Sequence, residues 1–353
     1  MRGPIKPLSL FGRLVLRRKA RGLSGGEGGA LANKGFRNRK IPLQIAALCL
    51  SCVAALAAAS LRLPGENGFL VPPPIEAAAA KAEKEMIQGE AFLKKEKIAA
   101  GIPIEAFSRG LIGDEYNDLT TTLGSLSAKR TAENPLWASV LVKRLWAAGL
   151  REGDFVAAGM SGSFPGLNLA LAMACRNLGL RLFAISSVTA STHGANQTGF
   201  TWPEMEARLL AQGYIEAVSV GIAAGGAGDM ATDLQPEGQA IARSIARNSA
   251  EALGARLLIP ENERDAVAKR VSLYRELAKG KRIALYVNVG GTEASLGASA
   301  VVLELSSGFL APIPFDLSEG RGVMAMMMES GVPVLSLLNI NDLALKWGVP
   351  IED

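Results

Sequence analysis

The sequence predicts an α/β protein, in which an N-terminal transmembrane helix is followed by a three-layer α/β domain with a mainly parallel sheet. From residue 154 onward, short apolar runs rich in β-branched residues alternate with longer segments of helical character. Strands this apolar, each followed by a helix, are typical of a parallel sheet covered on both faces. Upstream, the run "LQIAALCLSCVAALAAASL" at 43–61 contains no charged residue. As a helix it would be about 28 Å long, which matches one hydrocarbon core.

The N-terminal segments predict a basic cytoplasmic tail at 1–40 and a transmembrane anchor at 41–62. Lys and Arg on the amino side of an apolar helix keep that end in the cytoplasm. The expected location is therefore the cell membrane, with a single pass and the main domain extracytoplasmic. A cleaved signal peptide is the main alternative, because Ala57–Ala59 resembles a cleavage site, although the apolar run is longer than usual for one. A buried Ala-rich helix is the third interpretation.

Charge is divided unevenly along the chain. Residues 1–40 hold 11 of the 38 Lys and Arg and 1 of the 33 Asp and Glu, which leaves 27 basic and 32 acidic residues for the remainder. The folded part is therefore mildly acidic, which argues against nucleic acid as a partner. Cys175 is the only cysteine after the apolar run, so no intrachain disulfide is expected there. No motif identifies a cofactor.

The next segments lead from the membrane to the domain. We expect a linker and stand-off helix at 63–102, followed by an extracytoplasmic α/β domain at 103–353. The Pro- and Gly-rich beginning of this segment is typical of a linker. The Ala/Glu/Lys-rich stretch from residue 75 has high helix propensity. This helix would stand the domain off the bilayer or pack along its side, and a solvated amphipathic helix is the favoured interpretation. Residues 103–135 are polar and are expected to be irregular.

Within the domain, the expected elements alternate. A helix should begin after Asn134-Pro135 and stop at Gly149. The expected strands are Asp154–Met160, Arg181–Ser187, Ala217–Ile222, Arg256–Ile259, Arg282–Val289, Ala300–Leu305 and Val332–Leu338. The expected helices between them include Leu167–Leu178, Pro203–Gln212, Gly238–Leu253, Glu261–Lys279 and Val323–Ser330.

Three expected strands end in glycine-rich turns: "GMSGSFPG" (159–166), "GIAAGGAGDMATD" (221–233) and "NVGGTEASLG" (288–297). The carboxyl ends of parallel strands share one edge of a sheet, and ligands bind there. Glycine lets backbone amides approach a ligand, and a helix N-terminus favours negative charge. The three turns therefore predict a crevice that binds an anion. Its expected ligand-binding residues are Ser161, Gly162, Ser163, Gly226, Gly228, Gly291, Thr292, Glu293 and Arg321.

The first turn leaves three interpretations open. Its glycine spacing misses the dinucleotide fingerprint, and it lacks the Gly-Lys-Ser/Thr ending of a P-loop. The pattern at 159–163 is one residue short of a G-x-S-x-G nucleophile elbow. Ser161 could therefore be a nucleophile, part of an anion-binding loop, or part of a simple turn. Ser163 could equally be the N-cap of the following helix.

The catalytic interpretation combines Ser161 with His193, the only histidine in the chain, and Asp229. His193 follows the second strand, so it should lie at the same edge and could serve as general base. Asp229 or Glu293 could orient that base, bind a cation or cap a helix. One histidine and no cysteine pair exclude a zinc cluster, and an oxygen-only site would suit Mg²⁺ or Ca²⁺.

Other charged side chains have mainly structural interpretations. Thr201 and Glu204 form a capping-box pattern, and Glu206 is expected to face solvent. Arg321, between two glycines at an expected helix start, could reach an anion in the crevice or lie exposed in a loop.

Four segments carry a family resemblance: "TTTLGSLSAKRTAENP" (120–135), "GMSGSFPGLNLALA" (159–172), "ISSVTASTHGANQTGFTWPEME" (185–206) and "GGAGD" (225–229). Together they resemble the poly-γ-glutamate system protein family of membrane-anchored bacterial proteins associated with poly-γ-glutamate synthesis. The resemblance runs from about the membrane segment to the end of the chain and carries over no catalytic residues. It implies a cell-envelope role in making, anchoring or exporting an anionic polyamide, with other synthase or export subunits as partners.

Three functions follow from these patterns. The first is an accessory component of polymer synthesis or export that binds carboxylates in the glycine-loop crevice. The second is a serine-dependent hydrolase or transferase acting on γ-glutamyl amides, with the catalytic set named above. The third is a non-catalytic scaffold that contacts the synthase through its first helix or its transmembrane segment.

Overall fold

The computed structural model describes residues 70–297, 307–310 and 321–352. The expected basic tail and transmembrane segment, and the strand expected at 300–305, lie outside these ranges. Within them, no helix combines the length and the apolar character that a membrane crossing needs.

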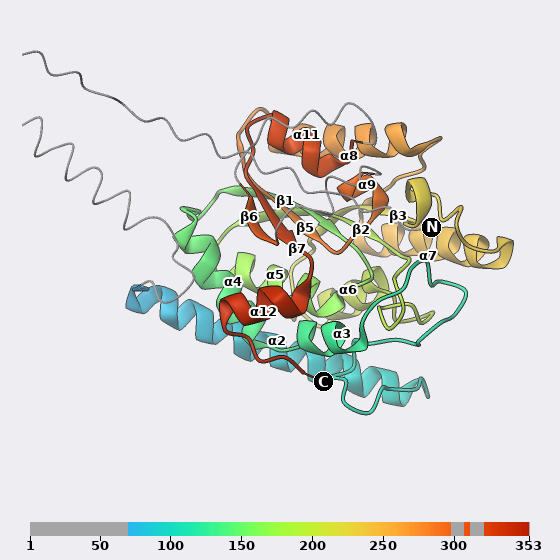
Figure 1. The fold of residues 1–353 in the computed structure, drawn as a ribbon, viewed down its shortest axis with the longest axis horizontal. Coiled ribbons are helices and arrows are strands. Elements are labelled where there is room, and N and C mark those ends of the chain that lie inside the picture. The colour runs from blue at the N-terminus through green and yellow to red at the C-terminus, as the bar shows by residue number, and fades with distance from the viewer. Residues whose placement is uncertain (1–69, 298–306, 311–320, 353) are drawn as a thin grey trace, which may run out of the picture. The chain divides into compact units, whose positions relative to one another are not determined.

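The centre of the described fold is a seven-stranded sheet in the order β4-β3-β2-β1-β5-β7-β6 (Figure 1). Neighbouring strands are parallel except for the edge strand β6, which runs antiparallel to β7. This confirms an α/β fold with a mainly parallel sheet. The strands are β1 Phe155–Met160, β2 Arg181–Ser187, β3 Ser219–Ala223, β4 Arg256–Leu257, β5 Ile283–Val289, β6 Gly308–Leu310 and β7 Val334–Leu337.

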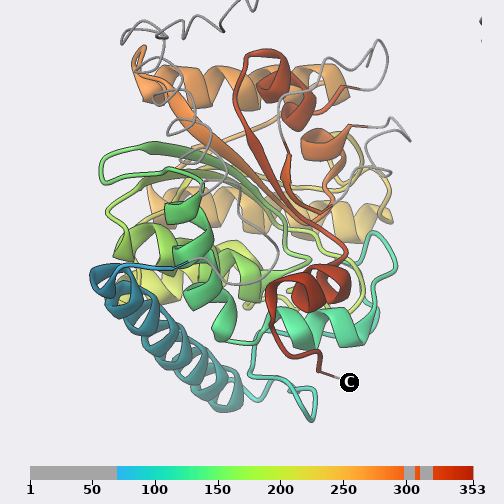
Figure 2. The same ribbon diagram turned by 60° about the vertical axis from the view of Figure 1, so that its left-hand side comes forward.

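Helices cover both faces of the sheet (Figures 1 and 2). One layer holds α8, α9 and α11, and the other holds α4, α5, α6 and α12, with α7 beside α6 against β3. The bounds are α2 Pro73–Ala99, α3 Leu126–Ala132, α4 Leu136–Ala147, α5 Pro165–Asn177, α6 Trp202–Ala211, η1 Ala227–Asp229, α7 Pro236–Leu253, α8 Glu263–Ala278, α9 Glu293–Leu296, α11 Val323–Glu329 and α12 Ile340–Trp347.

Local sequence signals explain several helix ends. Thr201 and Glu204 form the expected capping box at the start of α6, with the Thr201 amide donating to Glu204 Oε2 at 3.0 Å. Helix α7 ends at Gly254, which adopts the left-handed conformation that glycine tolerates. The expected N-cap at Ser163 does not form, because Phe164 is the residue that precedes α5.

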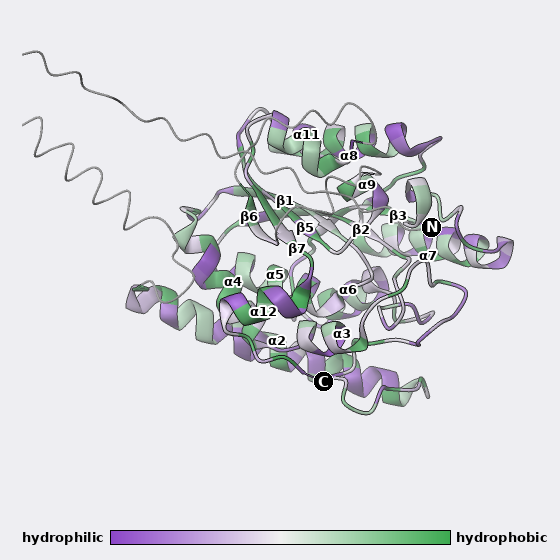
Figure 3. Cartoon of the chain, in the orientation of Figure 1, coloured by the Kyte–Doolittle hydropathy of each residue, from purple (hydrophilic) through white to green (hydrophobic). Residues whose placement is uncertain are grey.

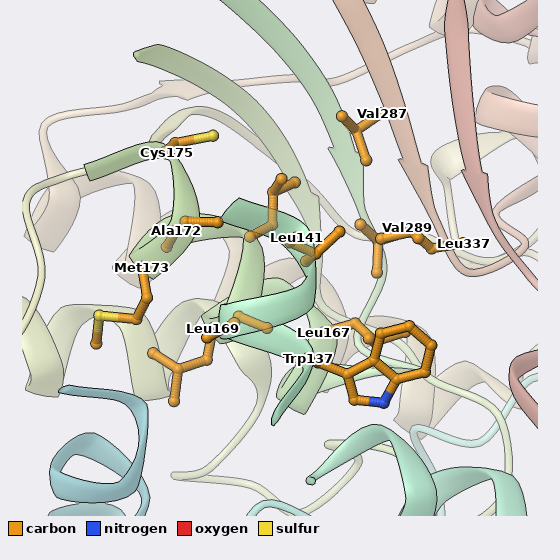
Figure 4. Packing of buried hydrophobic residues seen from close by; sticks show 14 of the residues in the cluster. Trp137, Leu141, Leu167, Leu169, Ala172, Met173, Cys175, Val287, Val289 and Leu337 are labelled. Atoms are coloured by element: carbon orange, nitrogen blue, oxygen red, sulfur yellow. The ribbon is translucent and has the colours of Figure 1, made fainter. Parts of the chain in front are cut away.

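Buried apolar side chains fill the space between the layers. In Figure 4, Leu141 of α4 lies close to Val289 of β5, and Trp137 lies beside Leu167 of α5. All four are at most 1% exposed. Figure 3 shows hydrophobic residues concentrated in the sheet and hydrophilic ones on the outer helices. The burial of nearly every strand residue explains why these strands read as continuous apolar runs.

Helix α2 packs along the side of the domain, outside α4 and α5 (Figure 2). Ala79, Ala82, Met86 and Leu93 on its inner face are fully buried, so the helix is not solvated all round. The region expected to be irregular, 103–135, contains α3.

Candidate functional site

The sheet has a topological switch point between β1 and β5. The chain passes from β1 through β2 and β3 to β4 on one side, and then crosses to β5 on the other side of β1. In open α/β sheets, ligands bind beyond the carboxyl ends of the strands at such a point. The first and third glycine-rich turns follow these two strands directly, and the second follows β3.

The first and third turns are in close contact. The amide of Ser161 donates to the carbonyl of Val289 at 3.2 Å. Gly290 has a φ of +80°, and a Cβ atom placed on it would lie 2.1 Å from Ser161 Oγ. Only glycine meets both conditions, because a side chain would be strained in that conformation and would collide with the hydroxyl. Gly290 therefore fixes how closely the two turns approach.

The second turn joins the third through Glu293. Its Oε2 accepts a hydrogen bond from the amide of Gly228 at 2.6 Å. The second turn also contacts the loop after β2, where the Thr189 amide donates to the Ala224 carbonyl at 3.0 Å. The three turns thus converge at one edge of the sheet, and Glu293 holds two of them together.

The first turn rests on a buried cation that the sequence did not single out. Lys129 of α3 is 3% exposed, and its Nζ donates to the Ser163 carbonyl at 2.5 Å and to Ser191 Oγ at 2.6 Å. The ammonium group also lies 3.9 Å from the centre of the Phe164 ring. It forms no ion pair with any described residue. Burial lowers the pKa of Lys129 to about 7.

The expected catalytic trio is not assembled. No hydrogen bond joins Ser161 to His193 in the described part of the chain; Ser161 Oγ accepts from the Ser163 amide at 3.3 Å. His193 has a φ of +57°, and its backbone amide donates to the Asp114 carbonyl at 2.8 Å.

Asp229 is engaged elsewhere, in a buried ion pair. Arg270 of α8 is fully buried and binds it in bidentate fashion, with Nε 2.5 Å from Oδ2 and Nη2 2.9 Å from Oδ1. Burial alone would lower the pKa of Arg270, but the adjacent carboxylate outweighs it, so the pKa lies above its ordinary value. This pair braces the second turn against β2, because Arg270 also donates to Ser187 Oγ at 3.0 Å.

Two charged side chains, Glu206 and Arg321, form contacts that the sequence did not predict. Glu206, expected to face solvent, is fully buried and accepts hydrogen bonds from the amides of Val218 and Ser219 and from the Ser219 hydroxyl. Burial raises the pKa of Glu206, against the opposing effect of these hydrogen bonds. Arg321, which lies just before α11, forms an ion pair with Glu329, the last residue of that helix.

A basic cavity of about 340 Å³ lies beside the second turn. Two exposed arginines of α7, Arg243 and Arg247, contribute the cationic groups of its lining. Arg243 donates to Gln239 Oε1 at 2.6 Å, and Arg247 has no acidic partner among the described residues. The rest of the lining is Ala224, Asp229, Met230, Thr232, Ala246, Leu257, Leu258, Ile259 and Pro260. The sequence signal was the i, i+4 spacing of the two arginines, which aligns them on one helix face.

Within the described ranges, no group of three or more His, Cys, Asp or Glu side chains could hold a metal ion. Comparison with known proteins gave no match, whether with protein-family models, with curated proteins or with solved structures.

Proposed function

We propose that this protein is a membrane-anchored accessory component of poly-γ-glutamate synthesis or export, which binds the anionic polymer at the carboxyl edge of its sheet. The observation that carries the proposal is the basic cavity beside the second glycine-rich turn. Arg243 and Arg247 are exposed, share a helix face and line that cavity together. The one acid in the lining, Asp229, is already neutralised by Arg270. The cavity therefore offers two cationic groups to an anion.

The lining matches the chemistry of a γ-glutamyl chain. Each repeat carries one carboxylate, one amide and a short methylene segment. Guanidinium groups bind carboxylates through paired hydrogen bonds, which would suit Arg243 and Arg247. The methylene segment would contact apolar side chains of the lining such as Leu257 and Leu258.

The glycine-rich turns would extend this surface toward the switch point. In the described part of the chain, the amides of Gly291 and Thr292 donate no hydrogen bond, and neither residue is buried. They are therefore available to acceptors on a ligand. Lys129 lies just beneath the first turn, and its protonated form adds positive charge without a carboxylate to cancel it. A polymer with regularly spaced carboxylates could bridge the turns and the cavity.

Calorimetric titration of the full-length protein with γ-glutamyl oligomers tests the proposal. We expect saturable binding that weakens as salt rises, because the contacts are charged and exposed. α-Linked glutamyl oligomers of equal length should bind less tightly, since their carboxylates sit on longer side chains. Absence of saturable binding at moderate ionic strength would contradict the proposal.

A second candidate is a serine-dependent hydrolase or transferase, which the contact between Lys129 Nζ and Ser191 Oγ favours. A neutral Lys129 would take the Ser191 hydroxyl proton while Oγ attacks a γ-glutamyl carbonyl. The amide C–N bond would then break, with the proton passing to the leaving amine and water later releasing the acyl group. This candidate ranks second because Ser191 is only 5% exposed. If Ser191→Ala leaves amine release from a γ-glutamyl substrate unchanged, the candidate fails.

A further inference from the structure

A second cavity, of about 290 Å³, lies on the other side of α7 from the basic one. Ile241 of α7 lines it, and Arg243, two residues further along, lines the basic cavity. Two residues turn an α-helix by about 200°, so the two cavities lie against different helix faces. We call this one the acidic cavity. Its lining is Ile102, Pro103, Asp114, Asn117, Asp118, Leu119, Asn196, Gln197, Thr198 and Ile241.

The charged side chains of this lining are all acidic, and a buried cation that interacts with Asp114, Lys97, lies outside the lining. It contains two carboxylates, Asp114 and Asp118, and no lysine, arginine or histidine. Asp114 accepts hydrogen bonds from Asn117 Nδ2 at 2.9 Å and from Gln197 Nε2 at 2.7 Å, both of which are neutral donors. Asp118 is exposed, and its carboxylate has no partner among the described residues. The acidic cavity thus presents negative charge that no cation of its own lining offsets.

Gln197 adds an acceptor that the protein leaves unused. This residue is 6% exposed, and its Nε2 is fixed by two acceptors, Asp114 Oδ1 and the Pro103 carbonyl. Its Oε1 is buried and accepts no hydrogen bond within the described ranges. A buried acceptor without a donor is costly, and native proteins rarely leave one unmatched. A ligand that brings N–H donors into the cavity would satisfy it.

We propose that the acidic cavity binds the ammonium group of a small aliphatic amine. The ammonium supplies positive charge to Asp114 and Asp118 and a hydrogen-bond donor to Gln197 Oε1. The apolar side chains of Ile102, Leu119 and Ile241 line the same cavity and suit an alkyl chain. This inference does not depend on the proposed polymer binding, because it uses different residues and the opposite ligand charge.

The cavity is attached to the glycine-rich turns through one short segment. The His193 amide donates to the Asp114 carbonyl, and the Ala195 amide donates to the Gly162 carbonyl, each at 2.8 Å. Residues 193–195 therefore connect Asp114 in the lining of the acidic cavity to the first turn. An amine in the cavity would stabilise the loop against which the first turn packs.

Titration of the full-length protein with putrescine tests the proposal, with butanediol as a neutral analogue of the same length. We expect saturable putrescine binding, no measurable butanediol binding, and weaker binding as salt rises. Asp118→Asn should weaken putrescine binding about fivefold, since it removes one exposed charge interaction. Glu152→Gln, which removes an exposed acid preceding β1, is the matched control and should leave the affinity unchanged.

A second variant keeps the test decisive if Asp118→Asn has a small effect. Thr198 is exposed at the lining, so Thr198→Lys should fold normally while placing a cation at the cavity. We expect it to abolish putrescine binding. The proposal is overturned if butanediol binds as well as putrescine, or if Thr198→Lys binds putrescine like the wild type. Equal losses in Asp118→Asn and Glu152→Gln would also overturn it, because they would indicate non-specific attraction.

Discussion

Two cavities of similar size flank helix α7, and their linings carry opposite charge. The basic cavity has Arg243 and Arg247, with its only acid neutralised by Arg270. The acidic cavity has Asp114 and Asp118, with no basic residue in its lining. The formal net charge of +5 conceals this division, because residues 1–40 contribute +10 (11 basic minus 1 acidic) and the remainder −5 (27 basic minus 32 acidic). What each cavity can bind depends on which side chains the fold brings to it, and the total charge of the chain does not determine it.

The largest effect should come from breaking the ion pair beneath the basic cavity. Arg270→Met leaves Asp229 buried with no counterion, which we expect to cost about 3–5 kcal/mol of the free energy of unfolding. Chemical denaturation measures this directly. The double variant Arg270→Met/Asp229→Asn is the control, because it removes both charges, tolerates the φ of +63° at position 229 and should recover part of the loss. If the single variant loses less than the double variant, the pair does not have the assigned role.

The next largest effects should come from reversing a charge at each cavity, which tests whether the two cavities are separate binding sites. Arg247→Glu places an acid in the basic cavity, and we expect the affinity for γ-glutamyl oligomers to fall more than tenfold. Asp118→Lys should leave that affinity within about twofold while it abolishes putrescine binding. Both side chains are exposed, so thermal unfolding should stay near the wild-type value. Oligomer binding that responds equally to both variants would contradict separate sites.

The buried Lys129 gives a pH-dependent test of the first turn. Its pKa is lowered to about 7, so between about pH 7 and its ordinary value the unfolded chain binds more protons than the folded chain. Stability should therefore rise with pH across that window, by at most about 1.4 kcal/mol per pH unit from this group. Lys129→Met should remove this rise. Identical pH slopes in wild type and Lys129→Met would refute the assignment.

The smallest effect is expected at His193. Its described hydrogen bond to the acidic-cavity region uses the backbone amide, and its φ of +57° is tolerated by asparagine. His193→Asn should change the free energy of unfolding by less than about 0.5 kcal/mol and leave oligomer binding unchanged. A large loss of oligomer binding would instead indicate that the imidazole takes part in that binding.

The sequence predicted the parts of the fold that repeat a clear local pattern. Long apolar strands such as β1 and β5, and helices with capping signals such as α6, were placed to within a few residues. Strand β6 has three residues, too few for a periodic signal. Helix α3 was missed because it has only seven residues and lies in a polar stretch, and the burial of Lys129 depends on neighbours more than 30 residues away.

The site was predictable in position but not in its interactions. Strand ends placed the three glycine-rich turns at one edge, since parallel strands share that edge. The partner of Asp229 could not be found from its surroundings in sequence, because Arg270 lies 41 residues further along the chain. The i, i+4 spacing of Arg243 and Arg247 is typical of any solvated helix face, and only the packing of β4 against α7 places them beside a cavity.

The most direct test of the central claim compares two arginine variants in one binding assay. The double variant Arg243→Gln/Arg247→Gln removes both cations of the basic cavity, and Arg282→Gln removes an exposed arginine just before β5, at the opposite edge of the sheet. The measurement is the dissociation constant for a γ-glutamyl oligomer at moderate ionic strength. We predict at least a tenfold loss in the double variant and none in Arg282→Gln. Equal affinities in both variants would contradict anion binding at this edge.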